Sequence, residues 1–192
     1  MTDSLLILGA GGHGRSIHEL ASLSGVFSHI AYLDDSWKTG GVERSNIIGR
    51  IDQLKDCAPR YTHAIIGIGN NKIREQLQCQ ASNLGLKLAT LIHPKSIVSP
   101  SVTVGAGTVV FAGVVIGSDA HIGQGVIINC ASAIDHDGTL EDFSHLGVGV
   151  HLAGSAYIGK SAFVQAGSCG GYLAYVEPFS VCAPGTVLKT RA

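Results

Sequence analysis

The chain is poor in charge, in aromatic residues and in long apolar runs. Charged residues make up 14% of its 192 residues, aromatic residues make up 6%, and the formal net charge is −1. A general nucleic-acid binder or membrane-surface binder would carry a basic patch, so the charge balance argues against both. No stretch approaches the roughly 20 apolar residues of a membrane span. We therefore expect neither a nucleic-acid partner nor a membrane partner.

The N-terminus and the cysteines also lack the marks of an exported protein. Asp3 precedes a short apolar run from Leu5 to Leu8, whereas a secretory signal has a basic start and a longer apolar segment. The five cysteines are odd in number and show neither metal-ligand nor redox spacing. They are typical of reduced thiols, so we expect a cytoplasmic protein without a metal site.

What the sequence has instead is an aliphatic residue at every sixth position from Val98 to Val164, with a small residue four positions after each. A period of six fits neither a helix nor a lone amphipathic strand, and it is typical of a parallel β-helix. The frame lapses at Gly170 and returns six residues later. We expect about four regular coils and a less regular fifth. The stretch from Gly170 to Tyr175 should form an outward loop or a distorted side.

Before the hexads, strand and helix patterns alternate, and this predicts a small parallel sheet of the half-Rossmann type. We expect a helix that ends near Gly25 and a polar stretch that leads through Ile47 to Leu54. The other expected elements are a helix over 72–84 and strands over 4–8, 29–33, 63–68 and 87–92. The predicted domains are therefore 1–92 and 93–192.

A glycine loop follows the first expected strand. Gly9, Gly11 and Gly14 fit the G-x-G-x-x-G fingerprint, and Asp34 and Asp35 come about 20 residues later. Such a loop admits a phosphate and such carboxylates bind ribose hydroxyls. A dinucleotide needs two such halves, so a single nucleotide fits better. The alternatives are a tight strand-to-helix turn for the glycines and a capped turn for the two acids.

Two further features lie near this loop. His13 occupies a phosphate-loop position, from which an imidazole can contact a phosphate or a sugar hydroxyl. Gly69, Asn70 and Asn71 follow another strand, at the edge where open α/β sheets bind ligands. Asn71 is alternatively only the N-cap of the next helix.

His136 is the strongest catalytic candidate among four histidines on the hexads. It lies between Asp135 and Asp137 at a polar corner, and flanking carboxylates raise the basicity of an imidazole and fix its tautomer. Acyl transfer to an amine or hydroxyl needs such a base; the alternative is a solvated surface histidine. Gly154 follows 18 residues later, one coil away, and offers a backbone N–H. His145 lies half a coil from His136, so the two meet only between subunits.

Several motifs together give the sequence a resemblance over essentially its whole length. They are Leu6 to Gly14, Leu33 to Asp35, Ile68 to Asn71, Leu91 to Pro94, Ile134 to Asp137, Phe143 to His145 and Leu152 to Gly154. In this order they resemble the bacterial sugar O/N-acyltransferases, hexapeptide-repeat enzymes that acetylate UDP-4-amino sugars of the bacillosamine type, perosamine or sialic acid.

The resemblance implies a left-handed β-helix, a homotrimer and acetyl-CoA bound between subunits. By resemblance His136 is the general base and Asp137 tunes it. The residues implied in acetyl-CoA binding are His145, Gly154 and Ala166. Those implied in nucleotide-sugar binding are Gly11, Gly12, His13, Asp34, Asp35, Gly69 and Asn70. Family members commonly end in a Gly-x-Pro-Ala segment, whereas this sequence ends at Lys189 to Ala192, so we expect a different wall for part of the cofactor groove.

We therefore predict an acetyl-CoA-dependent N-acetyltransferase that acts directly on the amino group of a nucleotide-linked deoxyamino sugar. Three alternatives stay open: an O-acetyltransferase for a hydroxyl such as that of sialic acid, a non-catalytic nucleotide-sugar-binding trimer, and a zinc-dependent hydratase with histidine ligands at a subunit interface.

Overall fold

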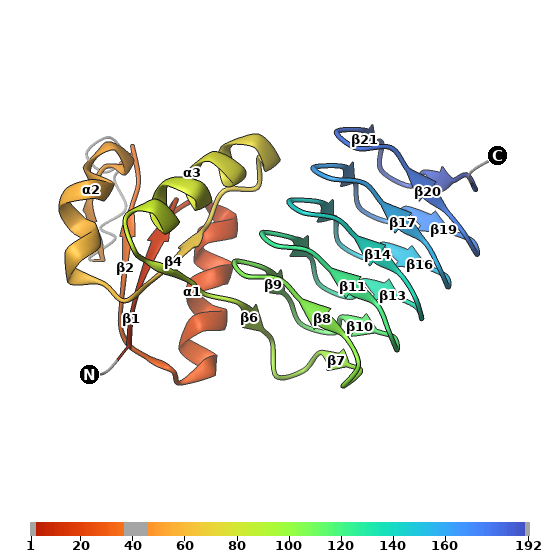
Figure 1. Cartoon of the computed structure of the whole chain (residues 1–192), viewed down its shortest axis with the longest axis horizontal. Helices are drawn as coiled ribbons and strands as arrows, with labels where there is room; N and C mark the ends of the chain where they lie inside the picture. Colours follow the sequence, from red (N-terminus) through yellow and green to blue (C-terminus); the bar gives the residue numbers. More distant parts are fainter. Residues whose placement is uncertain (1–2, 37–45, 191–192) are drawn as a thin grey trace. The chain divides into compact units, whose positions relative to one another are not determined.

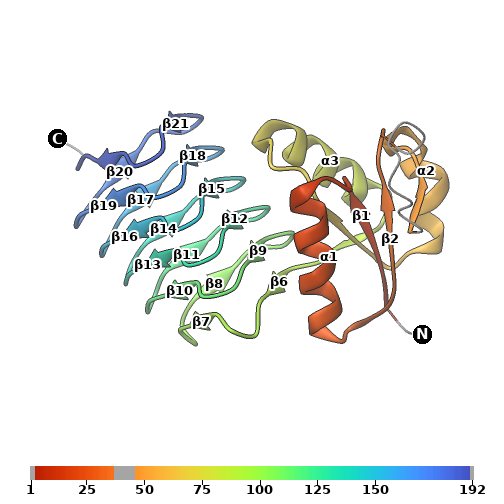
Figure 2. The same cartoon turned by 180° about the vertical axis from the view of Figure 1, so that it is seen from behind.

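The computed structural model describes residues 3–36 and 46–190, and the chain divides into two compact units, residues 1–91 and 92–192. Figure 1 and Figure 2 show both units from opposite sides, the first in red to yellow-green and the second in green to blue. No helix within the described ranges is long and apolar enough to cross a membrane.

The first unit is a parallel five-stranded sheet with the strand order β3-β2-β1-β4-β5. Leu5 to Leu8 of the central strand are fully buried, as expected for a strand with side chains packed on both faces. Leu6 shares one buried cluster with Leu54 and Leu77 of two helices, and alternation turns Ile7 to the opposite face. The elements are β1 (Asp3–Leu8), α1 (Gly12–Ser24), β2 (Phe27–Leu33), β3 (Ile47–Gly49), η1 (Ile51–Gln53), α2 (Leu54–Cys57), η2 (Ala58–Arg60), β4 (His63–Ile66), α3 (Asn71–Asn83) and β5 (Lys87–Leu88).

Two expectations for this unit are wrong in detail. The predicted strand over 87–92 is two strands, because only β5 pairs with β4, whereas Leu91 and Ile92 form β6, the first strand of a β-helix sheet. The stretch from Ile47 to Leu54 contains a strand and a 3-10 turn, since β3 pairs with β2 at the sheet edge. The part of the expected polar stretch that lies between Asp35 and Ile47 falls largely on residues 37–45, outside the described residues.

The second unit is built from two-residue strands stacked in three parallel sheets, as in a left-handed parallel β-helix. Each strand pairs with the strands 18 residues before and after it, so Ala133 lies between Val115 and His151. One sheet contains β7 (Ile97–Val98), β10 (Val115–Ile116), β13 (Ala133–Ile134), β16 (His151–Leu152), β19 (Cys169–Gly170) and β22 (Val187–Leu188). The second contains β8 (Thr103–Val104), β11 (His121–Ile122), β14 (Thr139–Leu140), β17 (Tyr157–Ile158) and β20 (Tyr175–Val176). The third contains β6 (Leu91–Ile92), β9 (Val109–Val110), β12 (Ile127–Ile128), β15 (His145–Leu146), β18 (Phe163–Val164) and β21 (Val181–Cys182).

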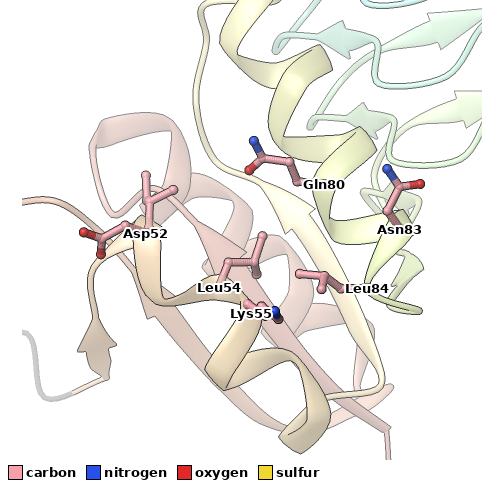
Figure 3. A pocket seen from close by; sticks show the side chains of 7 residues that line it. Asp52, Leu54, Lys55, Gln80, Asn83 and Leu84 are labelled. Atoms are coloured by element: carbon pink, nitrogen blue, oxygen red, sulfur yellow. The ribbon is translucent and has the colours of Figure 1, made fainter.

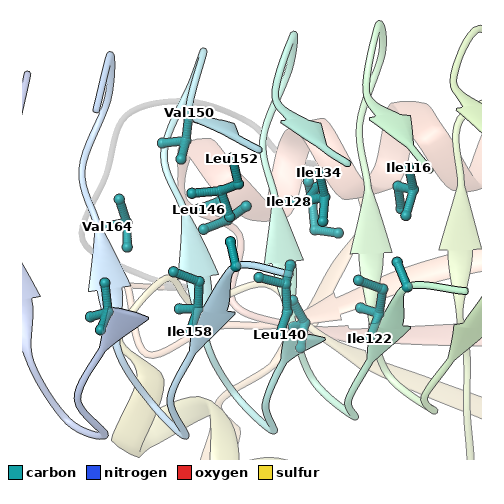
Figure 4. Packing of buried hydrophobic residues seen from close by; sticks show 14 of the residues in the cluster. Ile116, Ile122, Ile128, Ile134, Leu140, Leu146, Val150, Leu152, Ile158 and Val164 are labelled. Carbon is teal, nitrogen blue, oxygen red and sulfur yellow. The ribbon is translucent and has the colours of Figure 1, made fainter. Parts of the chain in front are cut away.

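The hexad aliphatics point inward and fill the coil interior, where Figure 4 shows them stacked one coil on the next. Most of the small residues four positions later are buried as well. Several of these are polar but satisfied. The buried Ser132 hydroxyl donates to the Gly147 carbonyl at 3.0 Å, and the buried Thr108 hydroxyl donates to the Gly123 carbonyl at 2.8 Å.

The outward loop or distorted side expected from Gly170 to Tyr175 is wrong. Gly170 belongs to β19 and Tyr175 begins β20, and both keep the regular pairing of their sheets. Neighbouring side chains fill the space where a side chain of residue 170 would lie. A Cβ built on Gly170 would be 2.6 Å from the Ala174 Cβ and 3.4 Å from Leu188. The coil therefore closes without an aliphatic residue at this position.

Candidate active site

The turn between β13 and β14 places His136 between two carboxylates. Its Nδ1 lies 2.7 Å from Oδ2 of Asp137, and its backbone N–H donates to Oδ1 of Asp135 at 2.8 Å. When Nδ1 carries the proton and donates to Asp137, Nε2 is left as the acceptor. The His136 side chain is half exposed.

Gly154 lies directly beside this imidazole. The Ser155 N–H donates to the His136 carbonyl at 2.9 Å, which stacks the two turns one coil apart. A Cβ built on Gly154 would come within 2.5 Å of the His136 Nε2, so only glycine leaves room for the ring. The Gly154 N–H donates no hydrogen bond within the part of the chain described. A base and a candidate oxyanion donor therefore lie side by side.

The two carboxylates also change the proton affinity of the base. The hydrogen bond with Asp137 raises the pKa of His136 above its usual value of 6.5, and the charge of Asp135 raises it further, while desolvation opposes both. A base whose pKa is raised accepts a proton from an amine or hydroxyl more readily than an ordinary imidazole.

His145 and Ala166 lie apart from this cluster within one chain. His145 begins β15, where its ring stacks on Phe163 with a centroid distance of 4.2 Å and its Nε2 lies 2.9 Å from the Asn129 amide nitrogen. Ala166 is exposed in the turn between β18 and β19. The turns that carry His136 and Gly154 join a different pair of sheets. The predicted acetyl-CoA residues thus lie on different sides of the β-helix of one chain.

The other hexad histidines make local contacts. His121 Nδ1 lies 2.7 Å from the Thr103 hydroxyl and His151 Nε2 lies 3.1 Å from the Ala131 carbonyl. Among the described residues, no three His, Cys, Asp or Glu side chains gather into a metal site.

In the first unit, two glycines of the fingerprint are required by the backbone, each for a different reason. Gly9 has a φ of +108°, and a Cβ on Gly14 would lie 2.0 Å from the Gly9 carbonyl oxygen. A Cβ on Gly67, which sequence reasoning missed, would lie 2.5 Å from the same oxygen. These three glycines allow β1, α1 and β4 to approach closely, so the tight-turn interpretation holds for them. A Cβ on Gly11 would meet nothing within 4 Å, and nothing in the fold requires glycine there.

Asp34 and Asp35 serve the loops at the carboxyl end of β2. Asp34 Oδ2 accepts from the Ala10 N–H at 2.6 Å and thereby ties the glycine loop to the end of β2. Asp35 lies 3.8 Å from the Arg50 guanidinium and accepts from the Ile51 N–H at 3.2 Å. Both carboxylates also organise backbone, and Asp34 lies directly against the predicted phosphate loop.

The first turn of α3, which follows the loop after β4, contains Arg74, a residue that sequence reasoning missed. Its guanidinium is buried and donates to the Gly69 carbonyl at 3.0 Å and to Oδ1 of Asn71 at 2.9 Å. Burial, and then the charge of Arg74, lower the pKa of His13 to about 4, so His13 is neutral at physiological pH. The helix N-cap is Asn70, whose side chain accepts from the Ile73 N–H at 3.1 Å, and not Asn71 as the alternative had it.

The first unit also has an open pocket of about 340 Å³ between η1, α2 and α3 (Figure 3). None of the predicted ligand-binding residues lines it. Its lining residues are Ile51, Asp52, Leu54, Lys55, Gln80, Asn83 and Leu84.

Residues 4–81 match the PglD N-terminal domain family. The chain is 36% identical to the acetyltransferase domain of PglB from Neisseria gonorrhoeae FA1090, with a TM-score of 0.92 over 97% of this chain and 91% of that one. The chain belongs to the bacterial sugar O/N-acyltransferase family. The family, its acetyltransferase class and the fold class are those expected from the sequence. The same PglB domain is solved in complex with acetyl coenzyme A, at 33% identity, a TM-score of 0.79 and coverage of 97% and 96%.

Two further family members resemble the chain. UDP-N-acetylbacillosamine N-acetyltransferase of Bacillus subtilis (strain 168) is 39% identical over 112 residues, which cover 55% of this chain and 50% of that protein. The match thus spans half the length of this relative. A mutant of perosamine N-acetyltransferase from Caulobacter crescentus, solved with CoA and GDP-perosamine, is 30% identical with a TM-score of 0.81 over 97% of this chain and 91% of that one.

Proposed function

We propose that this sugar acyltransferase is an acetyl-CoA-dependent N-acetyltransferase that acts on the amino group of a nucleotide-linked deoxyamino sugar. The observation that carries the proposal is the pairing of His136, held by Asp137, with the unused N–H of Gly154. The names of two relatives support the substrate class, because one is a UDP-N-acetylbacillosamine N-acetyltransferase and the other a perosamine N-acetyltransferase solved with GDP-perosamine. The PglB acetyltransferase domain, solved with acetyl coenzyme A, supports the donor.

In the proposed reaction, Nε2 of His136 accepts a proton from the acceptor amine as the amine nitrogen attacks the thioester carbonyl carbon. The Gly154 N–H donates to the oxygen that becomes negative in the tetrahedral intermediate. The C–S bond then breaks, and the CoA thiolate leaves and takes the proton from the His136 imidazolium. Asp137 keeps the imidazole in the tautomer that exposes Nε2. Transfer is direct, and Cys130, the cysteine nearest to His136 in sequence, lies at a different corner of the coil.

The proposed acceptor site lies at the carboxyl end of the first-unit sheet. The open backbone at Gly11 and Gly12 stands at the N-terminus of α1, where helix N–H groups attract phosphate. His13, held neutral, can exchange hydrogen bonds with a phosphate or sugar hydroxyl without charge. Asp34 and Asp35, with Gly69 and Asn70 from the neighbouring loop, complete the set proposed to bind the nucleotide sugar.

We propose a homotrimer because the donor residues lie on different sides of the β-helix of one chain. A neighbouring subunit would bring His145 and Ala166 of one chain toward His136 and Gly154 of another, with acetyl-CoA bound between them. Light scattering should give three times the chain mass of 19.8 kDa.

The proposed activity is tested by measuring thiol release from acetyl-CoA with UDP-, GDP- and dTDP-linked 4-amino sugars, and with their 4-hydroxy analogues as matched controls. Turnover that requires the amino group supports the proposal. Turnover with the hydroxyl compounds or with sialic acid alone would replace it with O-acetylation. Binding of a nucleotide sugar without any thiol release would identify a non-catalytic protein. Because acetyl-CoA is the donor, the proposal includes a cytoplasmic location.

A further inference from the structure

Successive turns between the β7–β22 sheet and the β8–β20 sheet form a column in which one residue per coil takes the same place. Ser155 N–H donates to the His136 carbonyl at 2.9 Å, and Leu173 N–H donates to the Gly154 carbonyl at 3.0 Å. The register therefore stacks His136, Gly154 and Tyr172 in that order, about 4.8 Å apart per coil.

The missing side chain at Gly154 makes this column unusual. The His136 ring occupies the space where a Cβ of Gly154 would lie, so it leans along the column toward the next coil. The next side chain along the column is Tyr172. Tyr172 is 61% exposed, and its side chain makes no ring stack or hydrogen bond within residues 3–36 and 46–190. The fold of one chain thus gives no reason for an aromatic residue here.

The proposed reaction indicates which end of the column faces the acceptor and which end faces the donor. In direct transfer the acceptor amine adjoins Nε2 of the base and the thioester oxygen adjoins the Gly154 N–H. What lies beyond Gly154 along the column is therefore the donor. We infer that Tyr172 is a donor-binding residue whose ring packs against the thioester and pantetheine arm of acetyl-CoA. This inference rests on the proposed function. A phenol ring offers the flat, mostly apolar surface that a chain of methylene and amide groups can cover.

The test compares Tyr172→Ala with the wild type in donor binding, measured by calorimetry with acetyl-CoA, and in steady-state kinetics. We expect the donor Kd and KM to rise roughly tenfold, a typical loss for an aromatic contact, while the acceptor KM stays within twofold. The loss should be equally large with S-acetylpantetheine, which keeps the arm and lacks the nucleotide. Tyr172→Phe keeps the ring and should restore donor affinity.

Phe179→Ala is the matched control, because Phe179 is an aromatic residue in a turn at another corner and is 69% exposed. It should leave the donor KM unchanged. Wild-type donor affinity in Tyr172→Ala, a rise in the acceptor KM alone, or a loss seen with acetyl-CoA but not with S-acetylpantetheine would overturn the inference. Failure of the wild type to bind acetyl-CoA would instead overturn the proposed function.

Discussion

Replacing Gly154 with alanine puts a methyl group where the His136 imidazole lies. The added Cβ would be 2.5 Å from Nε2 and 2.6 Å from Cε1, whereas ordinary contacts begin at 3.4 Å. The ring must therefore move by about 1 Å, which disturbs its 2.7 Å hydrogen bond with Asp137. Displacements of this size near the reacting atoms cost roughly 100-fold in rate, or about 2.7 kcal/mol in activation free energy.

The fold itself should tolerate Gly154→Ala. Gly154 does not have a positive φ, and the clashing group is the end of a half-exposed side chain that can rotate into solvent. We expect the thermal midpoint to stay within about 3 °C of the wild type while kcat falls roughly 100-fold. The assay is thiol release at saturating acetyl-CoA, with circular dichroism to check the fold.

Gly117→Ala is the contrasting variant, about two coils before Gly154 and packed against the backbone of Asp135 and His136. Its Cβ would lie 2.7 Å from the backbone nitrogen of His136 and 2.8 Å from the Asp135 carbonyl carbon. Backbone packed in a coil cannot move aside, so this variant should lower the thermal midpoint markedly. Wild-type turnover in a folded Gly154→Ala protein would refute the claim that the ring must lie against Gly154 for catalysis.

The remaining predictions concern proton affinity and packing. Asp137→Asn removes the largest cause of the raised His136 pKa; since the base works deprotonated, the acidic limb of kcat/KM should shift to lower pH while the maximum falls, and an unmoved limb would contradict this. Gly14→Ala should unfold the first unit, whereas Gly11→Ala should fold normally and raise the acceptor KM roughly tenfold; equal thermal midpoints would disprove the distinction. The pKa of His13 is about 4 in the folded protein, against its usual value of 6.5. The stability that His13 contributes is therefore fully present above pH 6.5, and the free energy of unfolding falls by roughly 3 kcal/mol as the pH is lowered to 4. His13→Gln should flatten that loss in pH-dependent melting, and a loss as steep as the wild type's would exclude His13 as its source.

The period of six predicts most of the second unit, because each inward position must meet its equivalent 18 residues away. That register also places Gly154 beside His136. Gly170 shows where the pattern fails: a missing aliphatic residue was interpreted as a break, but Ala174 and Leu188 fill its space. A sequence period depends only on which residue stands at each position. It contains no information on spatial neighbours that fill the space of a missing side chain.

The first unit is less predictable for a different reason. β3 and the short turns after Arg50 have only three or four residues each, too few to show a period. Gly67 directly follows β4, a position where glycine is common. Only the three-dimensional structure shows that it lies against Gly9. Arg74 lies on the buried face of α3 with Leu77 and Ala81, a position where a charged side chain is unusual. That spacing is the signal that could have identified it.

Loss of the base tests the central claim most directly. For His136→Ala we predict a kcat at least 100-fold below the wild type, the usual contribution of a general base. Acetyl-CoA binding should stay within threefold, because the Gly154 backbone and Tyr172 remain. Turnover within tenfold of the wild type, measured with the same amino-sugar acceptor and the same donor, would contradict the assignment of His136 as the catalytic base.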